Sequence, residues 1–299
     1  MKFESAHFGE KLLEQSEAIF TTERLFSALF LEAMKFHKEK ELLELALSDE
    51  FQMSDAMLHN NGLYFPKPIG YPRVNNVQRN NKTESRKEAK KVKELSFLYE
   101  DDFDLFLSGE ANLEDLQQFT SEQKSLFVND IKTSVGEDPY RIGTVYYEVN
   151  TSLAVIATKH PLIEQLFESL KFSGLGGKRS SGLGQFEFEV ESLEPYLLDR
   201  ITLESKEPVM LLSKALPLDE ELGIILDGSS YLLEKSSGFA FSYSAGRNYR
   251  KQDLYKFKAG STFDRTFKGT IVDVAPDNFP HPVWSFSKPL FLRLEVPSE

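Results

Sequence analysis

Residues 172–190, FSGLGGKRSSGLGQFEFEV, place five glycines directly before an alternating, strand-like run. Glycines permit positive φ angles and close approach of another backbone, and successive N–H groups can form a nest for an anion. Lys178 and Arg179 add positive charge, and Ser180 and Ser181 add hydroxyl donors. This chemistry suits a phosphodiester chain, although a glycine-rich turn that only joins a helix to a strand has the same composition.

The loop differs from the two common nucleotide-binding loops. In a P-loop the lysine is followed directly by Ser or Thr and a helix, whereas here Arg179 follows Lys178 and a strand comes next. The dinucleotide fingerprint requires a strand before the loop and a helix after it. Here the amphipathic run PLIEQLFESLKF, residues 161–172, predicts a helix before the loop. The order of elements therefore excludes both nucleotide-binding loops.

Length and composition indicate a folded protein of two modest domains. The chain has 299 residues, of which 40% are hydrophobic, with 25 Phe and no Cys. The absence of Cys excludes disulfides, thiolate zinc sites and cysteine nucleophiles, and it fits a cytoplasmic protein best. No run approaches the roughly 20 apolar residues of a spanning helix. We therefore expect a cytoplasmic location and no contact with a membrane.

Charge is segregated along the chain. The net charge of −12 argues against a general nucleic-acid binder, because affinity for phosphate comes from Lys and Arg. Residues 97–123, however, carry eight acids and no Lys or Arg, whereas residues 247–268 carry seven basic residues against two acids. Such a distribution allows a local basic groove on an acidic protein.

The coarse pattern predicts two α+β units, each built on an antiparallel sheet, with boundaries at 1–190 and 191–299. Thr21 and Thr22 with Glu23 predict a helix cap. In the first unit we expect a short strand at 1–5, helices from 22 through 36, over 38–47, 82–98 and 161–172, a loop-rich segment at 51–74, and a hairpin over 145–158. In the second unit we expect strands at 196–205 and at 281–296, with turn-punctuated strands between them.

The glycine loop also carries a resemblance. Gly174 to Gly184 reads G-x-G-x-x-x-S-x-G-x-G between a helix and an alternating strand, and this resembles the signature loop of the RAMP superfamily. RAMP proteins are CRISPR-associated RNA-binding proteins built from ferredoxin-like, RRM-related domains. Further stretches are similar to the RAMP subunit of the type III-A (Csm) interference complex that caps the 5′ handle of the CRISPR RNA, namely IFTTERLFSAL at 19–29, GLYFPKPIG at 62–70, AGSTF at 259–263 and HPVW at 281–284.

The resemblance implies a non-catalytic role without a cofactor. Such a subunit grips the repeat-derived 5′ tag of the guide RNA, docks on the large polymerase-like subunit that makes cyclic oligoadenylates, and starts the filament of backbone RAMP subunits. One departure is that the family commonly has Ser-Asp at the start of the first helix, where this chain has Thr22-Glu23. Both pairs can cap a helix, so we interpret the change as structural.

The RNA-binding residues expected from loop chemistry and resemblance fall into three groups. Arg247, Arg250 and Lys251 interleave with Tyr249 in a mixture suited to phosphate contact and base stacking, although a solvated hairpin tip would look alike. Lys132 and Arg141 flank a segment that, by resemblance, lies in the hairpin that RAMP proteins push against the guide, and they are otherwise ordinary surface charges. The glycine loop supplies Gly174, Gly176, Lys178, Arg179, Ser180, Ser181 and Gly182.

Two alternatives remain open. Some RAMP proteins cut precursor RNA with a histidine base, for which His37 or His7 would serve here. A protein-only scaffold is favoured by the net charge and disfavoured by the basic glycine loop. No pair of histidines has metal-binding spacing, so we expect no metal site. Asp101, Asp102 and Asp104 could imitate a magnesium cluster, but an acidic solvated face or a docking surface for a protein is the simpler interpretation.

Overall fold

The computed structural model describes residues 1–9, 12–72, 82–133, 139–202, 205–242 and 247–294. Every strand pair between the described strands is antiparallel, so the α+β class with antiparallel sheets is confirmed. The elements up to the glycine loop are β1 (Lys2–Phe3), β2 (Ser5–Ala6), α1 (Thr22–Lys35), α2 (Glu39–Leu47), β3 (Met57–His59), β4 (Leu63–Pro66), α3 (Lys82–Glu94), β5 (Phe97–Tyr99), α4 (Glu100–Ser108), α5 (Leu113–Ser125), β6 (Phe127–Thr133), β7 (Arg141–Tyr147), β8 (Ser152–Ala154) and α6 (Pro161–Ser173).

The glycine loop contains a single 3₁₀ turn, and small sheets follow it. The remaining elements are η1 (Arg179–Ser181), β9 (Phe186–Glu187), α7 (Pro195–Arg200), β10 (Ile201–Thr202), β11 (Val209–Leu211), α8 (Asp219–Ile225), β12 (Leu233–Ser236), β13 (Phe239–Ser242), β14 (Arg247–Arg250), β15 (Leu254–Phe257), β16 (Thr262–Phe263), β17 (Thr270–Asp273), β18 (Trp284–Ser287) and β19 (Phe291–Arg293).

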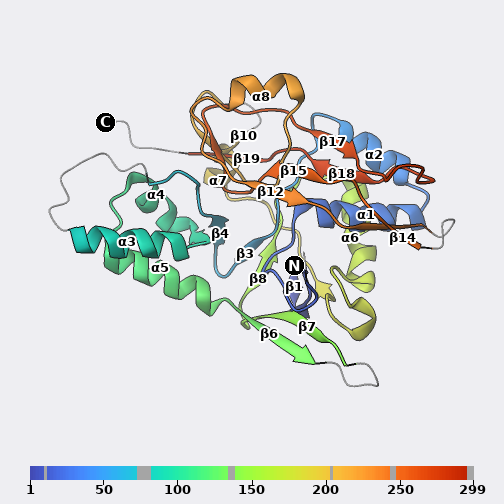
Figure 1. Ribbon diagram of the computed structural model, residues 1–299, viewed down its shortest axis with the longest axis horizontal. Coiled ribbons are helices and arrows are strands. Elements are labelled where there is room, and N and C mark those ends of the chain that lie inside the picture. Colours follow the sequence, from blue (N-terminus) through green and yellow to red (C-terminus); the bar gives the residue numbers. More distant parts are fainter. Residues whose placement is uncertain (10–11, 73–81, 134–138, 203–204, 243–246, 295–299) are drawn as a thin grey trace.

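Three sheets of three or four strands organise the chain, in the orders β2-β7-β6, β5-β4-β3-β8 and β10-β19-β11-β16. Figure 1 shows α3, α4 and α5 together at one end of the molecule and α6 at the other, with the β6–β7 hairpin extending from its lower edge. The hairpin pairs in register from Phe127↔Tyr147 to Thr133↔Arg141. Because β6 lies at the edge of its sheet, nearly all its side chains are exposed.

Buried side chains form clusters that draw on both halves of the sequence. Leu25, Phe26 and Leu29 of α1 lie in one cluster with Phe286, whose ring centre is 5.2 Å from that of Phe26. A second cluster joins the region of α4 and α5 to Met210 and Leu292. The boundary at residues 190 and 191 stays a prediction, and the hydrophobic contacts cross it.

A buried ion cluster also connects the two halves. Glu23 in the first turn of α1 lies 3.1 Å from Lys256 Nζ and 3.4 Å from Lys251 Nζ, and it accepts a hydrogen bond from Ser236 Oγ. Lys256 is fully buried and also donates to Ser285 Oγ at 2.8 Å. Burial alone would raise the pKa of the Glu23 carboxyl, but Lys256 and Lys251 lower this pKa to about 2.

The predicted cap at Thr21 and Thr22 is wrong. Thr21 occupies the N-cap position of α1 without a side-chain cap hydrogen bond. Thr22 instead donates from its N–H and from Oγ1 to Asp55 Oδ1, at 2.7 and 2.6 Å. The Thr22-Glu23 pair therefore makes tertiary contacts, with Asp55 on one side and the ion cluster on the other. The helix itself begins at Thr22 as predicted.

The predicted hairpin over 145–158 is also wrong. β7 pairs with β2 and β6, whereas β8 pairs with β3 in another sheet, with Leu58 opposite Leu153. The supposed loop at 51–74 contains the β3–β4 hairpin, in which Leu58 pairs with Tyr64. Pro66 is tolerated there because it ends its strand.

Two helix–strand assignments differ as well. Residues 195–200 form α7, although a strand was predicted over 196–205. The helix is favoured because Pro195 occupies its first turn, where proline is well tolerated. The helix predicted over 82–98 ends at Glu94, and Phe97–Tyr99 form β5. The strand after the glycine loop is short, since β9 covers only Phe186–Glu187.

Candidate RNA-binding interface

The glycine loop is anchored to the N-terminal strand segment. Gly177 N donates to His7 O at 2.9 Å, and Gly184 N donates to Ser5 O at 2.9 Å. A Cβ on Gly176, whose φ is +104°, would lie 2.7 Å from His7 O, and one on Gly184 would lie 2.0 Å from Leu175 O. These glycines are therefore required by close backbone contacts within the protein.

The tip of the loop faces solvent. Arg179, Ser180, Ser181 and Gly182 are exposed, and Lys178 is half-buried. Gly182 has a φ of +85° and open space where a side chain would stand. The N–H groups of Gly174, Leu175, Gly177, Ser181, Gly182 and Gly184 all donate to carbonyls of the chain. Side chains at the tip are therefore the main groups that a phosphate could contact.

The loop and the β6–β7 hairpin meet at an aromatic ring. Lys178 Nζ lies 4.1 Å from the centre of the Tyr140 ring, a cation–π contact. Arg141 follows Tyr140 and opens β7, with its side chain exposed. On the same hairpin Lys132 Nζ lies 4.7 Å from the centre of the Tyr146 ring. The structure thus brings the loop together with the hairpin that carries Lys132 and Arg141.

Arg179 is oriented by the end of α6. Its Nη1 donates to Gly174 O at 3.4 Å and to Ser173 O at 3.5 Å. Ser173 Oγ also accepts from Lys35 Nζ of α1 at 2.8 Å, so α1, α6 and the loop converge at this point. These hydrogen bonds hold one edge of the guanidinium group, while the residue remains exposed.

The candidates in the second half are arranged differently. Lys251 belongs to the buried ion cluster with Glu23, and Arg250 Nη2 pairs with Asp253 at 3.0 Å. The Tyr249 ring packs against Phe279, with ring centres 5.4 Å apart. Arg247 begins β14, and its side chain lies outside the described residues. The contacts described for Lys251, Arg250 and Tyr249 are made with segments other than the glycine loop, and the role of these residues in RNA binding stays a prediction.

The two histidines considered as catalytic bases, His7 and His37, lie in different environments. His7 is 6% exposed, and its Nδ1 lies 2.6 Å from Gly143 O. His37 follows α1 with a φ of +57°. His160 Nδ1 accepts from Leu162 N and so caps α6. Within the described ranges, no three His, Asp or Glu side chains gather as a metal ion would require.

Both α4 and α5 carry acidic residues in their first turns. Asp104 pairs with Arg200 at 3.1 Å. Burial, with the neighbouring carboxylates of Glu122, Asp101 and Asp115, raises the pKa of Asp102 to about 6. Burial is the main cause of this shift, and the neighbouring carboxylates add to it.

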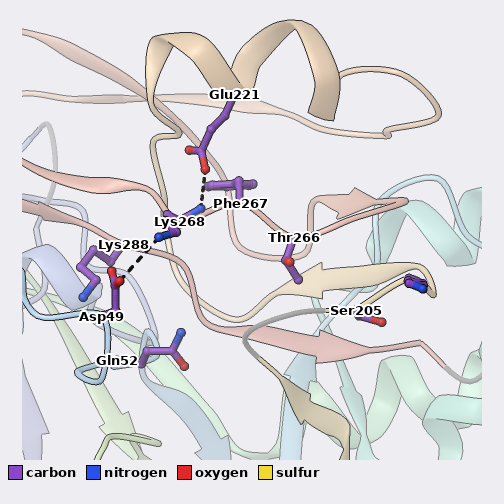
Figure 2. A pocket seen from close by; sticks show the side chains of 9 residues that line it. Asp49, Gln52, Ser205, Glu221, Thr266, Phe267, Lys268 and Lys288 are labelled. Carbon is purple, nitrogen blue, oxygen red and sulfur yellow. Dashed lines mark hydrogen bonds and ion pairs between the residues drawn. The ribbon is translucent and has the colours of Figure 1, made fainter.

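A separate hollow lies between the end of α2 and the segments around Ser205 and Thr266, with a volume of about 600 Å³ (Figure 2). Its charged groups are engaged within the chain: Lys268 Nζ pairs with Asp49 at 3.5 Å, and Glu221 accepts from Lys268 N at 2.7 Å. Lys288 Nζ donates to the carbonyls of Ala46 and Ser48. This hollow shares no residue with the candidate interface.

Comparison with known proteins decides the family. The chain is 43% identical over 299 residues to the CRISPR system protein Csm4 of Streptococcus thermophilus, covering 99% of this chain and 98% of that protein. It is 33% identical to Csm4 of Mycobacterium tuberculosis, covering 98% and 95%. The chain belongs to the Csm4 family. A family model described as the CRISPR Csm4 C-terminal domain matches residues 204–294.

Solved structures give the same fold at lower identity. A chain of the Csm3-Csm4 subcomplex in the type III-A CRISPR-Cas interference complex matches with a TM-score of 0.62 and 17% identity, covering 98% of this chain and 96% of that one. A chain of the Csm1-Csm4 cassette in complex with pppApA matches with a TM-score of 0.58 and 15% identity, covering 94% of each chain. The resemblance to the RAMP subunit of the type III-A complex, inferred from the glycine loop together with four further stretches, is thus confirmed at the level of the Csm4 family.

No helix in the described ranges combines the length and apolarity that crossing a bilayer requires. Tyr140, which joins the glycine loop to the β6–β7 hairpin, was not among the residues predicted for the interface. Its position beside Arg141, an aromatic residue next to a cation, was the available signal.

Proposed function

We propose that the chain is a non-catalytic RNA-binding subunit of a type III-A CRISPR ribonucleoprotein, acting in antiviral defence. In this role it grips the repeat-derived 5′ handle of the crRNA and docks on the large polymerase-like subunit and on backbone RAMP subunits. The observation that carries the proposal is the juxtaposition of the exposed tip of the glycine loop with the β6–β7 hairpin through Lys178 and Tyr140. Three cations, Lys178, Arg179 and Arg141, border this junction.

The mechanism follows from the arrangement of these groups. Lys178, Arg179 and Arg141 attract phosphates, and the Ser180 and Ser181 hydroxyls donate to phosphate oxygens at the exposed tip. Contacts to phosphate fix the register of the strand, so that unstacked bases of the handle face other side chains. Solved assemblies of Csm4 with Csm3 and with Csm1 support the inference that this subunit also meets a backbone subunit and a large subunit.

The test is to co-express the chain with the large subunit and a CRISPR array, purify the assembly and sequence its RNA. We expect guides that share one repeat-derived 5′ end, and a loss of these guides in the K178Q/R179Q variant. The control is K87Q/K93Q, which removes the same charge from exposed positions on α3, at the other end of the molecule from α6 (Figure 1). A protein assembly that carries no RNA would favour the protein-only scaffold.

Salt dependence provides a second readout. The logarithm of affinity for single-stranded RNA falls with the logarithm of salt concentration with a slope of about −0.7 per neutralised phosphate. If Lys178 and Arg179 each contact a phosphate, K178Q/R179Q should therefore reduce the magnitude of the slope by about 1.4. An unchanged slope with weaker binding would indicate that the variant has disturbed the loop rather than removed phosphate contacts.

A further inference from the structure

Phe172 is an exposed aromatic residue whose side chain lies outside the buried core. It lies in the last turn of α6, off the buried face formed by Leu162, Ile163, Leu166, Phe167 and Leu170. Its side chain is 80% exposed. Burying a phenylalanine side chain stabilises a fold, and this position forgoes that gain. A single exposed apolar residue is common on protein surfaces, so its surroundings must decide whether it has a role.

The surroundings of Phe172 combine cations with hydrogen-bonding groups. Lys171 Nζ lies 5.3 Å from the centre of the Phe172 ring. A hollow of about 310 Å³ adjoins the ring and is lined also by Lys2, Glu4, Gln185, Phe186 and Glu187. Amide, carboxylate and ammonium groups are those that hydrogen-bond with base edges. The ring therefore borders a hollow that is lined by both apolar and hydrogen-bonding groups.

Phe172 is also adjacent to the cations of the candidate interface. The next two residues, Ser173 and Gly174, accept the hydrogen bonds from Arg179 Nη1. An exposed ring beside a cation that contacts phosphate is the combination with which proteins bind single-stranded nucleic acid, because every base has a face that can stack. A protein partner would be favoured by a wider apolar patch, whereas the residues around this hollow are mostly polar or charged.

We infer that Phe172 is a stacking platform for one unpaired base of the RNA held by the glycine loop, with the edge of that base directed into the neighbouring hollow. This inference rests on the proposed function, since it requires RNA at the loop. It adds a base contact to an interface otherwise made of phosphate contacts. Phe172 would thus help to set which nucleotide occupies this position.

The test uses the chain assembled with the large subunit and an RNA oligonucleotide of the repeat-derived 5′ tag, carrying 2-aminopurine in place of one base at a time. Stacking on Phe172 should quench the probe at one position in the wild-type assembly. F172A should relieve the quenching and weaken RNA binding about 5- to 150-fold, the loss that one stacked base implies. F172Y should restore both signals, whereas F172L should not.

The control is L198A, which removes an apolar side chain of comparable exposure from α7. Equal RNA affinity and quenching in F172A and the wild type would overturn the stacking role and leave the proposed function intact. Rescue by F172L as complete as by F172Y would also overturn it, because an apolar contact would then suffice. A wild-type assembly that fails to bind the tag would overturn the proposed function and the stacking role together.

Discussion

Lys178 Nζ lies 4.1 Å from the centre of the Tyr140 ring, and through this contact the glycine loop touches the β6–β7 hairpin. The two segments are far apart in sequence, and each has exposed cations. A ring between them holds the ammonium group without neutralising it. The positive charge therefore stays available to a phosphate while its position is restricted.

A double-mutant cycle should detect this contact. We expect Y140L and K178M to show a coupling of about 0.5–1 kcal/mol in the free energy of unfolding, the range for an exposed cation–π pair. Chemical denaturation of the single and double variants measures the coupling. The same cycle with Y140F in place of Y140L should show almost none, because the ring remains. A coupling near zero in both cycles would mean that the contact contributes nothing to stability.

Removing the Glu23 carboxylate should destabilise the fold strongly. E23Q leaves Lys256, which is fully buried, without its anionic partner, and breaking such a buried pair typically costs about 3–5 kcal/mol. Urea denaturation at neutral pH gives the change in the free energy of unfolding. D49N is the matched control, since the ion pair of Asp49 with Lys268 is exposed and should contribute less than about 1 kcal/mol. Similar losses in the two variants would contradict this account.

Acid should abolish the difference between E23Q and the wild type. The pKa of Glu23 is lowered from 4.5 to about 2 in the folded state, so its carboxylate stabilises the fold above pH 4.5. This stabilisation declines as the pH falls from about 4.5 towards 2. The free energies of unfolding of the two proteins, measured across this range, should therefore converge. A constant gap would mean that the loss in E23Q comes from packing rather than charge.

D102N should stabilise the protein above pH 6. The folded state raises the pKa of Asp102 from 3.8 to about 6, so the ionised carboxylate is disfavoured there. Its unfavourable contribution grows as the pH rises from about 4 to 6 and is complete above 6. Thermal unfolding of D102N should show an increase in Tm at pH 7 that disappears at pH 3.5. D277N, at an exposed position, should show no such pH-dependent gain.

Two glycines of the loop should differ in their tolerance of alanine. G182A places a side chain in open space and is affected mainly by its positive φ, at a cost of about 1–2 kcal/mol. G176A has the same conformational cost and in addition drives Cβ against His7 O. Chemical denaturation should therefore show a larger loss for G176A. Equal losses would mean that the N-terminal segment moves away without cost.

The start of α1 shows what the sequence can and cannot predict. Apolar spacing from Leu25 onward predicted the helix and its buried face, since both depend on neighbouring residues. The partners of Thr22 and Glu23 could not be predicted, because Asp55 and Lys256 are distant in the chain. A local pattern allows a cap, and the tertiary structure replaces it with stronger contacts.

Strand pairing shows a related limit. The apolar runs around β7 and β8 were identified as strands, but their assignment to two different sheets depends on β2 and β3, which the runs themselves do not specify. At the candidate interface, the glycine loop was predicted from local composition, and the structure places the tip of this loop at the surface. The contact of the loop with Tyr140 was not predicted, because the two segments come together only in the folded chain.

Helix α1 connects the ion cluster to the glycine loop. Glu23 lies in its first turn, and Lys35, its last residue, donates to Ser173 beside the loop. Fourteen residues of helix span about 21 Å, and each added residue turns the helix by about 100°. A one-residue insertion in α1 would therefore rotate one attachment out of phase with the other. The length and phase of this helix thus set the spacing between the glycine loop and the ion cluster of the second half.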